Sequence, residues 1–147
     1  MNNNMENYLL DTNHCIYVIN GIDKKTSRKT ETEHKVIKKI KTIQSEIFIS
    51  EVTLGELYFG AANSNRKEYN LKRIELFKQI IMPVTIDEDI WRLFGETKAM
   101  LRKRGKSIAD MDLLIACTSR IFGFILVTND KDFDVLPDDF LKENWAE

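Results

Sequence analysis

Short apolar runs alternate along this chain with longer stretches in which apolar residues recur every three or four positions. The short runs predict buried strands, and the recurring positions predict helices with one buried face. Residues 8–10 predict a short buried strand and residues 47–49 a second strand, and the continuous apolar run 125–128 is typical of a strand covered on both faces. A fourth strand, at residues 82–86, contains Pro83, which indicates an edge position or a strand start.

Helical patterns fill the intervals between these strands. We expect helices over residues 12–21, 35–43, 51–61, 70–80, 87–104 and 112–123. In the fourth of these, Leu71, Ile74, Leu76 and Phe77 are predicted to face inward. The last is apolar on every side in its first half, so we expect it to be buried. The polar stretch 21–33 is interpreted as a flexible loop.

Alternation of strands and helices favours a parallel sheet with helices on both faces. The sequence therefore predicts an α/β fold, a three-layer α/β/α sandwich with a central, mostly parallel sheet. The chain has 147 residues, which is enough for one domain to bury about 70% of its extended-chain surface. We expect a single domain over residues 1–147.

The composition and the N-terminal sequence indicate in which cellular compartment the protein is expected. The chain is 43% hydrophobic and 31% charged, with a net charge of −1, as in an ordinary globular protein. Cys15 and Cys117 lie in apolar surroundings without metal-type spacing, which favours free thiols in a reducing compartment. No signal-peptide pattern opens the chain, and no apolar run approaches the ~18–20 residues that span a bilayer. We expect a cytoplasmic protein with no membrane partner.

Basic residues are unevenly distributed despite this balanced net charge. Two clusters stand out: Lys24, Lys25, Arg28, Lys29, Lys35, Lys38, Lys39 and Lys41 in one, and Arg102, Lys103, Arg104 and Lys106 in the other. Such runs are most often solvated helix faces. They gain a use in binding a phosphate backbone only where a neighbouring site takes a polyanion.

Four acids fall where parallel sheets bind ligands, outside the carboxyl ends of the strands. Asp11 directly follows the first strand, and Asp130 follows the strand at residues 125–128. Glu56 lies in a helix that starts just after a strand, and Asp112 heads the buried helix. We expect these four side chains to converge on one edge of the sheet.

Each acid also has a purely structural interpretation. Asp11 and Asp130 can cap the helix or turn that follows them. Glu56 can complete a capping box with Thr53, and Asp112 can stabilise a helix N-terminus. Asp110 competes with Asp112, but residues two apart do not share a helix face. We assign Asp110 as the N-cap and Asp112 to the acidic group.

Carboxylates brought together repel one another unless cations neutralise them. Oxygen ligands without clustered histidine or cysteine favour Mg²⁺ or Mn²⁺, and neither His14 nor His34 repeats at ligand spacing. Such ions promote hydrolysis of phosphate esters. We therefore predict one catalytic and metal-binding group, consisting of Asp11, Glu56, Asp112 and Asp130.

Four motifs in order strengthen this interpretation. They are YLLDTN at residues 8–13, ISEVTLGEL at 49–57, DLLIA at 112–116, and LVTND at 126–130 with Asp132 and Phe133. Together they resemble the PIN domain, and specifically the VapC toxins of bacterial toxin–antitoxin pairs, over nearly the whole chain. The ending ENW, at 143–145, resembles the VapC subgroup that cleaves initiator tRNA. The polar stretch near residues 24–33 is longer than the family pattern, and residues 134–137 lack its commoner glycine.

The resemblance implies an endoribonuclease toxin of a type II toxin–antitoxin system that acts on RNA, tRNA above all, with Mg²⁺ or Mn²⁺. It also implies a homodimer and a cognate VapB-type antitoxin. Carried over, Asp11 and Asp112 are the principal metal ligands, completed by Glu56 and Asp130 directly or through water. Thr12, Asn13 and Thr128 are the implied donors that orient these carboxylates.

Two other classes of protein remain as alternatives. One is a catalytically inactive PIN-like module that binds RNA or protein, although such a relative would be expected to have lost an acid. The other is a phosphatase of the haloacid dehalogenase type, whose nucleophilic Asp also follows a first strand. That chemistry needs a second Asp two residues on, and this chain has Asn13 there.

Overall fold

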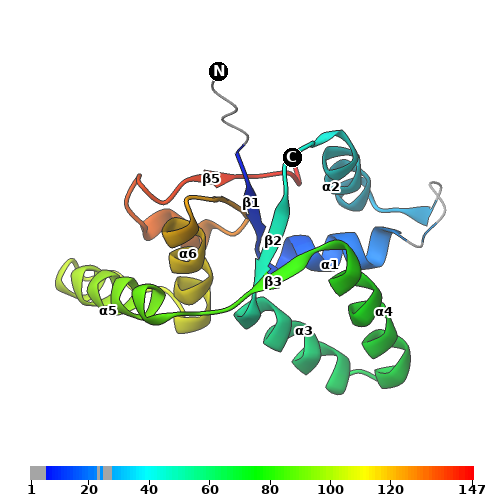
Figure 1. The fold of residues 1–147 in the computed structure, drawn as a ribbon, viewed down its shortest axis with the longest axis horizontal. Helices are drawn as coiled ribbons and strands as arrows, with labels where there is room; N and C mark the ends of the chain where they lie inside the picture. The colour runs from blue at the N-terminus through cyan, green and yellow to red at the C-terminus, as the bar shows by residue number, and fades with distance from the viewer. Residues whose placement is uncertain (1–5, 23, 25–27) are drawn as a thin grey trace.

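A wholly parallel sheet of five strands lies at the centre of the chain in a computed structural model, which describes residues 6–22, 24 and 28–147 (Figure 1). The strand order is β3-β2-β1-β4-β5. The bounds are β1 Tyr8–Leu10, β2 Ile47–Ser50, β3 Met82–Val84, β4 Ile125–Val127 and β5 Lys142–Glu143. The predicted parallel sheet is confirmed, as is the edge position of β3, while β5 has no counterpart among the predicted strands.

The two central strands, β1 and β4, pair in parallel and are buried on both faces. Leu9 is in register with Leu126, and both side chains belong to one apolar core. Leu10 is in register with Val127, and both belong to the core on the opposite face. Because successive side chains of a strand point to opposite faces, a strand between two helical layers must be apolar throughout.

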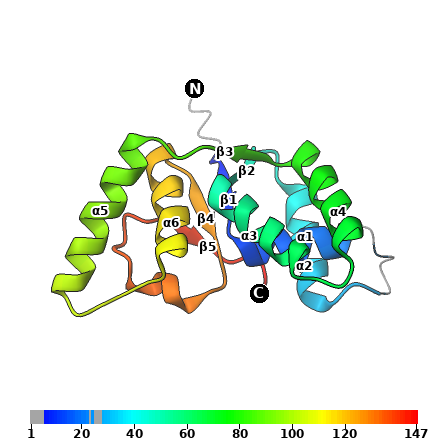
Figure 2. The same cartoon turned by 90° about the horizontal axis from the view of Figure 1, so that it is seen from below.

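Helices cover both faces of the sheet and form the outer layers of the predicted sandwich (Figures 1 and 2). The core that contains Leu10 and Val127 is covered by α1 Thr12–Ile22, α2 Glu31–Thr42, α3 Glu51–Ala62 and α4 Lys67–Ile80. The core that contains Leu9 and Leu126 is covered by α5 Glu88–Lys103, α6 Asp110–Phe122 and the short 3-10 helix η2 Lys131–Val135. In the part of the chain that the structure describes, none of the helices has both the length and the apolar character needed to cross a membrane.

The C-terminal end of the polar stretch 21–33 is helical, although the sequence predicts a flexible loop for the whole stretch. Helix α2 begins at Glu31, because Thr30 and Glu33 form a reciprocal capping box. The Glu33 carboxylate is buried and accepts hydrogen bonds from Lys24 Nζ at 2.9 and 3.1 Å. Residues 23 and 25–27 lie outside the described part of the chain, so the loop prediction is untested there and wrong from residue 30 onward.

Most of the predicted helix ends are confirmed, but one side chain of α4 that is predicted to face the core is exposed. Asp87 caps α5, and Gly123 ends α6 in the left-handed conformation at φ 71°. In α4, Ile74 and Phe77 are buried as expected, but Leu76 is 56% exposed. Leu76 is two residues from Ile74, which on a helix turns its side chain about 200° away from the core.

Candidate metal centre

The predicted acids come from three strand ends that meet at one edge of the sheet. Asp11 directly follows β1, and Asp130 follows β4 after two residues. Glu56 lies in the second turn of α3, which starts where β2 ends, and Asp112 lies in the first turn of α6. Parallel strands bring their carboxyl ends to the same edge, so the topology alone gathers these four segments.

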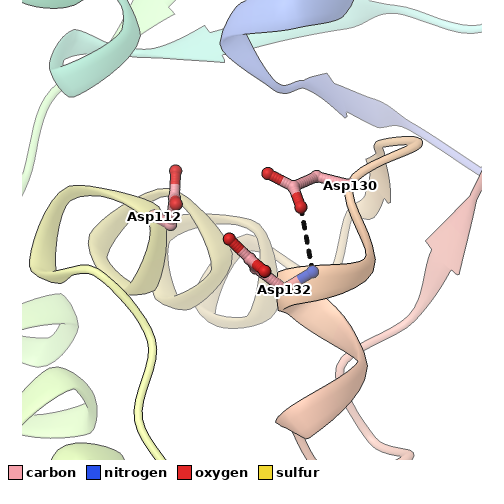
Figure 3. Close-up of side chains that lie close together, drawn as sticks. All are labelled: Asp112, Asp130 and Asp132. Atoms are coloured by element: carbon pink, nitrogen blue, oxygen red, sulfur yellow. Dashed lines mark hydrogen bonds between the residues drawn. The ribbon is translucent and has the colours of Figure 1, made fainter.

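Three aspartates form a compact group that we call the aspartate cluster: Asp112, Asp130 and Asp132 (Figure 3). One carboxylate oxygen from each lies within 4.8 Å of the others. Asp112 and Asp130 are half-buried, whereas Asp132 is exposed. Over the described residues, no lysine or arginine forms an ion pair with any of the three. Among the described residues, their negative charges therefore have no paired cation.

The chain reverses tightly at η2 to bring Asp130 and Asp132 together. The backbone N–H of Asp132 donates to Asp130 Oδ1 at 2.9 Å, so Asp130 caps η2 (Figure 3). The backbone N–H of Asp130 donates in turn to Thr128 Oγ1 at 3.0 Å, and buried Phe133 anchors the turn in the core. The structural interpretation of Asp130 as a cap is confirmed, and its second oxygen stays available to the cluster.

Asp11 combines capping with burial. The residue is 3% exposed, and its Oδ1 accepts the backbone N–H of His14 at 2.8 Å, at the start of α1. The same oxygen lies 2.9 Å from His14 Nδ1. The imidazole is fully buried, and its Nε2 has no hydrogen-bond partner among the described residues. A carboxylate oxygen needs a donor, so the proton is assigned to Nδ1.

Glu56 is held by a neighbouring element rather than by its own helix. Thr12 Oγ1 donates to Glu56 Oε1 at 2.6 Å, which confirms that Thr12 orients a carboxylate. The alternative of a capping box with Thr53 is wrong, because Ser50 is the N-cap of α3 and Thr53 is buried inside the helix. Thr128 acts on the backbone of Asp130 instead of on a carboxylate.

All of these charges act on Asp112. Burial first, and then the charges of Glu56, Asp130, Asp11 and Asp132, raise its pKa from 3.8 to about 6. Burial followed by the charges of Asp11 and Glu56 also raises the pKa of the Cys15 thiol. Asp11 and Glu56 thus lie within electrostatic reach of Asp112, although the compact cluster itself does not include them.

Asp110 differs from its neighbour Asp112 in every respect that matters here. Its carboxylate forms an exposed ion pair with Lys98 Nζ at 2.8 Å. Its assignment as N-cap is wrong, because Ala109 holds that position and α6 has no side-chain cap. The expectation that only one of the two aspartates joins the acidic group agrees with this geometry.

The donor set suits a hard divalent cation. Every candidate ligand atom is a carboxylate oxygen, the type that Mg²⁺ and Mn²⁺ take. Asp112, Asp130 and Asp132 can hold an ion between them. Asp11 Oδ2 and Glu56 Oε2 are engaged by no hydrogen bond from the described residues, so each can face an ion directly or through water.

The predicted site set lacks two residues that the structure adds. Asp132 lies in the 3-10 helix that Asp130 caps, and the predicted turn after Asp130 does not show that the Asp132 carboxylate faces the other acids. His14 lies three residues after Asp11, the spacing of a cap contact, and an apolar helix face hides its imidazole. The pattern Asp-x-Asp after a buried strand is the one signal that indicates Asp132.

Comparison with known proteins agrees with this geometry. Residues 8–139 match the family model described as PIN domain. The chain is 32% identical to "Ribonuclease VapC2" of Rickettsia felis, over 94% of this chain and 97% of that protein. It is 34% identical to "tRNA(fMet)-specific endonuclease VapC" of Shigella flexneri, over 85% and 87%. Its fold is similar to that in the structure of VapBC-1 from nontypeable Haemophilus influenzae, with a TM-score of 0.81, 25% identity, and 96% and 99% of the two chains covered.

Proposed function

The chain belongs to the PIN-domain family, and from that premise we propose that it is a VapC-type endoribonuclease toxin that cuts RNA at an acid-held Mg²⁺ or Mn²⁺ site. The observation that carries the proposal is the aspartate cluster, uncompensated by any cation of the described protein and placed at the carboxyl edge of the sheet. An inactive module would have no need to maintain such repulsion. All four acids of the predicted site are present.

We propose tRNA as the substrate class within RNA. The support comes from relatives named tRNA(fMet)-specific endonuclease, which are 34% and 30% identical to this chain. The ending ENW, which resembles that subgroup, also has a role in the fold: the Trp145 ring is buried and packs edge-on against Tyr8 at 5.0 Å between centroids. That contact holds residue 145 beside β1.

A bound divalent cation supplies a polarised water as nucleophile and neutralises charge on the phosphate. The residues of the chain supply and orient the carboxylate oxygens that would hold this cation. The Asp112, Asp130 and Asp132 carboxylates supply facing oxygens, and Thr12 fixes the carboxylate of Glu56. His14 fixes Asp11 through two donors on one oxygen, which leaves the other oxygen with a defined direction.

We propose two protein partners, an antitoxin of the VapB type and a second copy of the chain. The antitoxin is supported by structural neighbours that are VapBC assemblies, from Rickettsia felis and Haemophilus influenzae. Several large apolar side chains with more than half of their surface exposed are accessible to a partner. They are Phe59, Leu76, Ile80, Met82, Trp91, Met111 and Leu141.

Incubation of the purified protein with total tRNA tests the function. With Mg²⁺ or Mn²⁺ we expect cleavage at one or a few phosphates, and EDTA should abolish it. Intact tRNA at high protein concentration with both metals would contradict the proposal and favour a binding module. Release of phosphate from small phosphomonoesters, with tRNA intact, would favour a phosphatase instead.

A further inference from the structure

The two basic clusters of this chain differ in how far acids already neutralise them. We call the first the α2 lysines, Lys35, Lys38, Lys39 and Lys41, which all lie on α2. We call the second the α5–α6 basic loop, Arg102, Lys103, Arg104 and Lys106, which spans the end of α5 and the segment that leads into α6. A surface that binds a polyanion needs cations whose charge is not already balanced.

The α2 lysines are partly balanced. Lys35 Nζ lies 3.4 Å from Glu31, and Lys39 Nζ lies 3.6 Å from Glu143. A hollow of about 350 Å³ beside α2 is lined by Lys35, Lys38 and Lys39, but also by Glu143 and Glu147. A phosphate chain entering this hollow would meet carboxylates as well as ammonium groups, so its net electrostatic gain would be small.

The α5–α6 basic loop has no such compensation. From Lys98 to Lys106 the chain contains five cations and no acid. All four members of the loop are exposed, and none forms an ion pair with a described acid. Lys98, just before them, neutralises Asp110, the nearest acid outside the aspartate cluster.

The loop is joined to the aspartate cluster by a short segment of chain. Lys106 precedes Asp112 by six residues, so their Cα atoms are at most about 20 Å apart. Gly105 adopts φ 68°, and the backbone N–H of Lys106 donates to the carbonyl of Leu101 at 2.8 Å, which closes the end of α5. Figure 2 shows this segment leading from the end of α5 into the start of α6.

Helix stability offers a structural explanation for part of the loop. Cations in the last turn of a helix gain about 0.3–1 kcal/mol from the helix dipole, and Arg102 and Lys103 lie in that turn. The effect fades beyond the last turn. It therefore does not account for Lys106, which follows the C-cap residue Arg104.

We propose that the α5–α6 basic loop is the surface that binds the phosphate backbone of the RNA beside the aspartate cluster. The inference rests on the proposed function and deepens it by assigning the contact surface. Arginine and lysine there release counterions from the RNA, and the two arginines can bind phosphate oxygens in pairs. The loop thereby offsets the repulsion between the acidic site and its polyanionic substrate.

Two variants with the same change of charge test the proposal. One replaces Arg102, Lys103, Arg104 and Lys106 by Gln, and the other replaces the α2 lysines by Gln. Both are made in an Asp112→Asn background without added divalent cation, so that binding of tRNA is measured apart from cleavage. The dissociation constant is measured between 50 and 200 mM salt.

The loop variant should bind tRNA about 10- to 100-fold more weakly at 100 mM salt, with a salt slope reduced by roughly three. The α2 variant should weaken binding less than about threefold. Equal losses in both variants, or a larger loss in the α2 variant, would overturn the proposal. So would unchanged binding by the loop variant.

The double variant Arg104→Gln/Lys106→Gln separates RNA binding from helix stability, because it retains both cations of the last turn. It should keep the melting temperature of the parent protein. The logarithm of its tRNA affinity should fall by about half as much as in the variant that lacks all four cations of the loop. Unchanged affinity in this double variant would contradict the inference. Failure of the wild type to cut tRNA, with binding still dependent on the loop, would instead refute the proposed function alone.

Discussion

The acids of this protein divide into two groups that are treated in opposite ways. Asp11 and Glu56 are each fixed by a short hydrogen bond from a neighbouring side chain or backbone group. Asp112, Asp130 and Asp132 face one another with no cation of the described chain between them. Asp130 also accepts a hydrogen bond from the Asp132 backbone, but the carboxylates of the cluster repel one another, whereas Asp11 and Glu56 do not belong to it.

This difference separates stability from function. Hydrogen bonds to a charged group contribute about 1.5–3 kcal/mol, so the positioned pair, Asp11 and Glu56, stabilises the fold that holds it. Asp112 in the aspartate cluster does the reverse, because burial and then repulsion by the neighbouring acids raise its pKa to about 6. A divalent cation relieves that cost, which is how a protein reserves binding energy for a metal.

The largest expected effect comes from removal of the most strongly perturbed charge. Asp112→Asn should lower RNA cleavage by at least about a thousandfold, since it removes a ligand that the proposed metal chemistry requires. The metal-free variant should be as stable as the wild type or more so. Asp110→Asn is the matched control, two residues away and paired with Lys98, and should retain cleavage. Equal losses of cleavage in both variants would contradict the separation of these two aspartates.

Asp132 tests whether the exposed member of the cluster takes part. Asp132→Asn should weaken Mn²⁺ binding and cleavage about 10- to 100-fold, by removing one oxygen ligand from the cluster. Asp134→Asn is the control, because Asp134 pairs with Lys142 at 2.8 Å outside the cluster. Cleavage rates of both variants at saturating and limiting Mn²⁺ measure the effect. If Asp132→Asn binds Mn²⁺ as tightly as the wild type, Asp132 is not a ligand and only the acids predicted from the sequence hold the metal.

His14 tests the positioned pair. His14→Phe keeps a buried ring but loses the donor to Asp11 Oδ1, and Mn²⁺ affinity should fall about tenfold. His14→Asn, whose amide can reach the same oxygen, should recover part of the affinity. His34→Phe, on the exposed face of α2, should have no effect. A loss in His14→Phe that His14→Asn does not reduce would indicate a packing role alone.

The smallest expected effect is on stability against pH. The folded pKa of Asp112, about 6, lies above its unfolded value of 3.8, so the folded state binds this proton more tightly. Unfolding free energy in EDTA should therefore fall as the pH rises from about 4 to 6, and then level off. The fall should be about 1–2 kcal/mol after allowance for solvent screening.

Urea unfolding of the wild type and Asp112→Asn across this range measures the effect as a difference. The two curves should converge near pH 4 and separate towards pH 7, with the variant the more stable of the two. A difference that does not change with pH would mean that the cluster carries no electrostatic strain.

The same contrast explains how much the sequence predicts. The apolar runs that form β1, β2 and β4 identify the parallel sheet, and the topology then gathers Asp11, Glu56, Asp112 and Asp130. Asp132 and the donor to Asp11 escape prediction because both depend on local turns and side-chain packing. The capping box that begins α2 at residue 30 escapes for a related reason: a polar stretch looks alike whether it starts a helix or a loop.

Strand β5 shows a further limit. It is two residues long, with no apolar run of its own, and it forms only because the chain end packs beside β4. The contact of Trp145 with Tyr8 holds this segment in place. That contact is tertiary, so no periodic pattern in the sequence indicates it.

Titration of Mn²⁺ into the metal-free protein, followed by electron paramagnetic resonance, tests the shared carboxylate site most directly. The wild type should bind Mn²⁺ in competition with Mg²⁺, Asp112→Asn should bind it at least tenfold more weakly, and Asp110→Asn should match the wild type. Equal Mn²⁺ affinity in the wild type and Asp112→Asn would contradict the account.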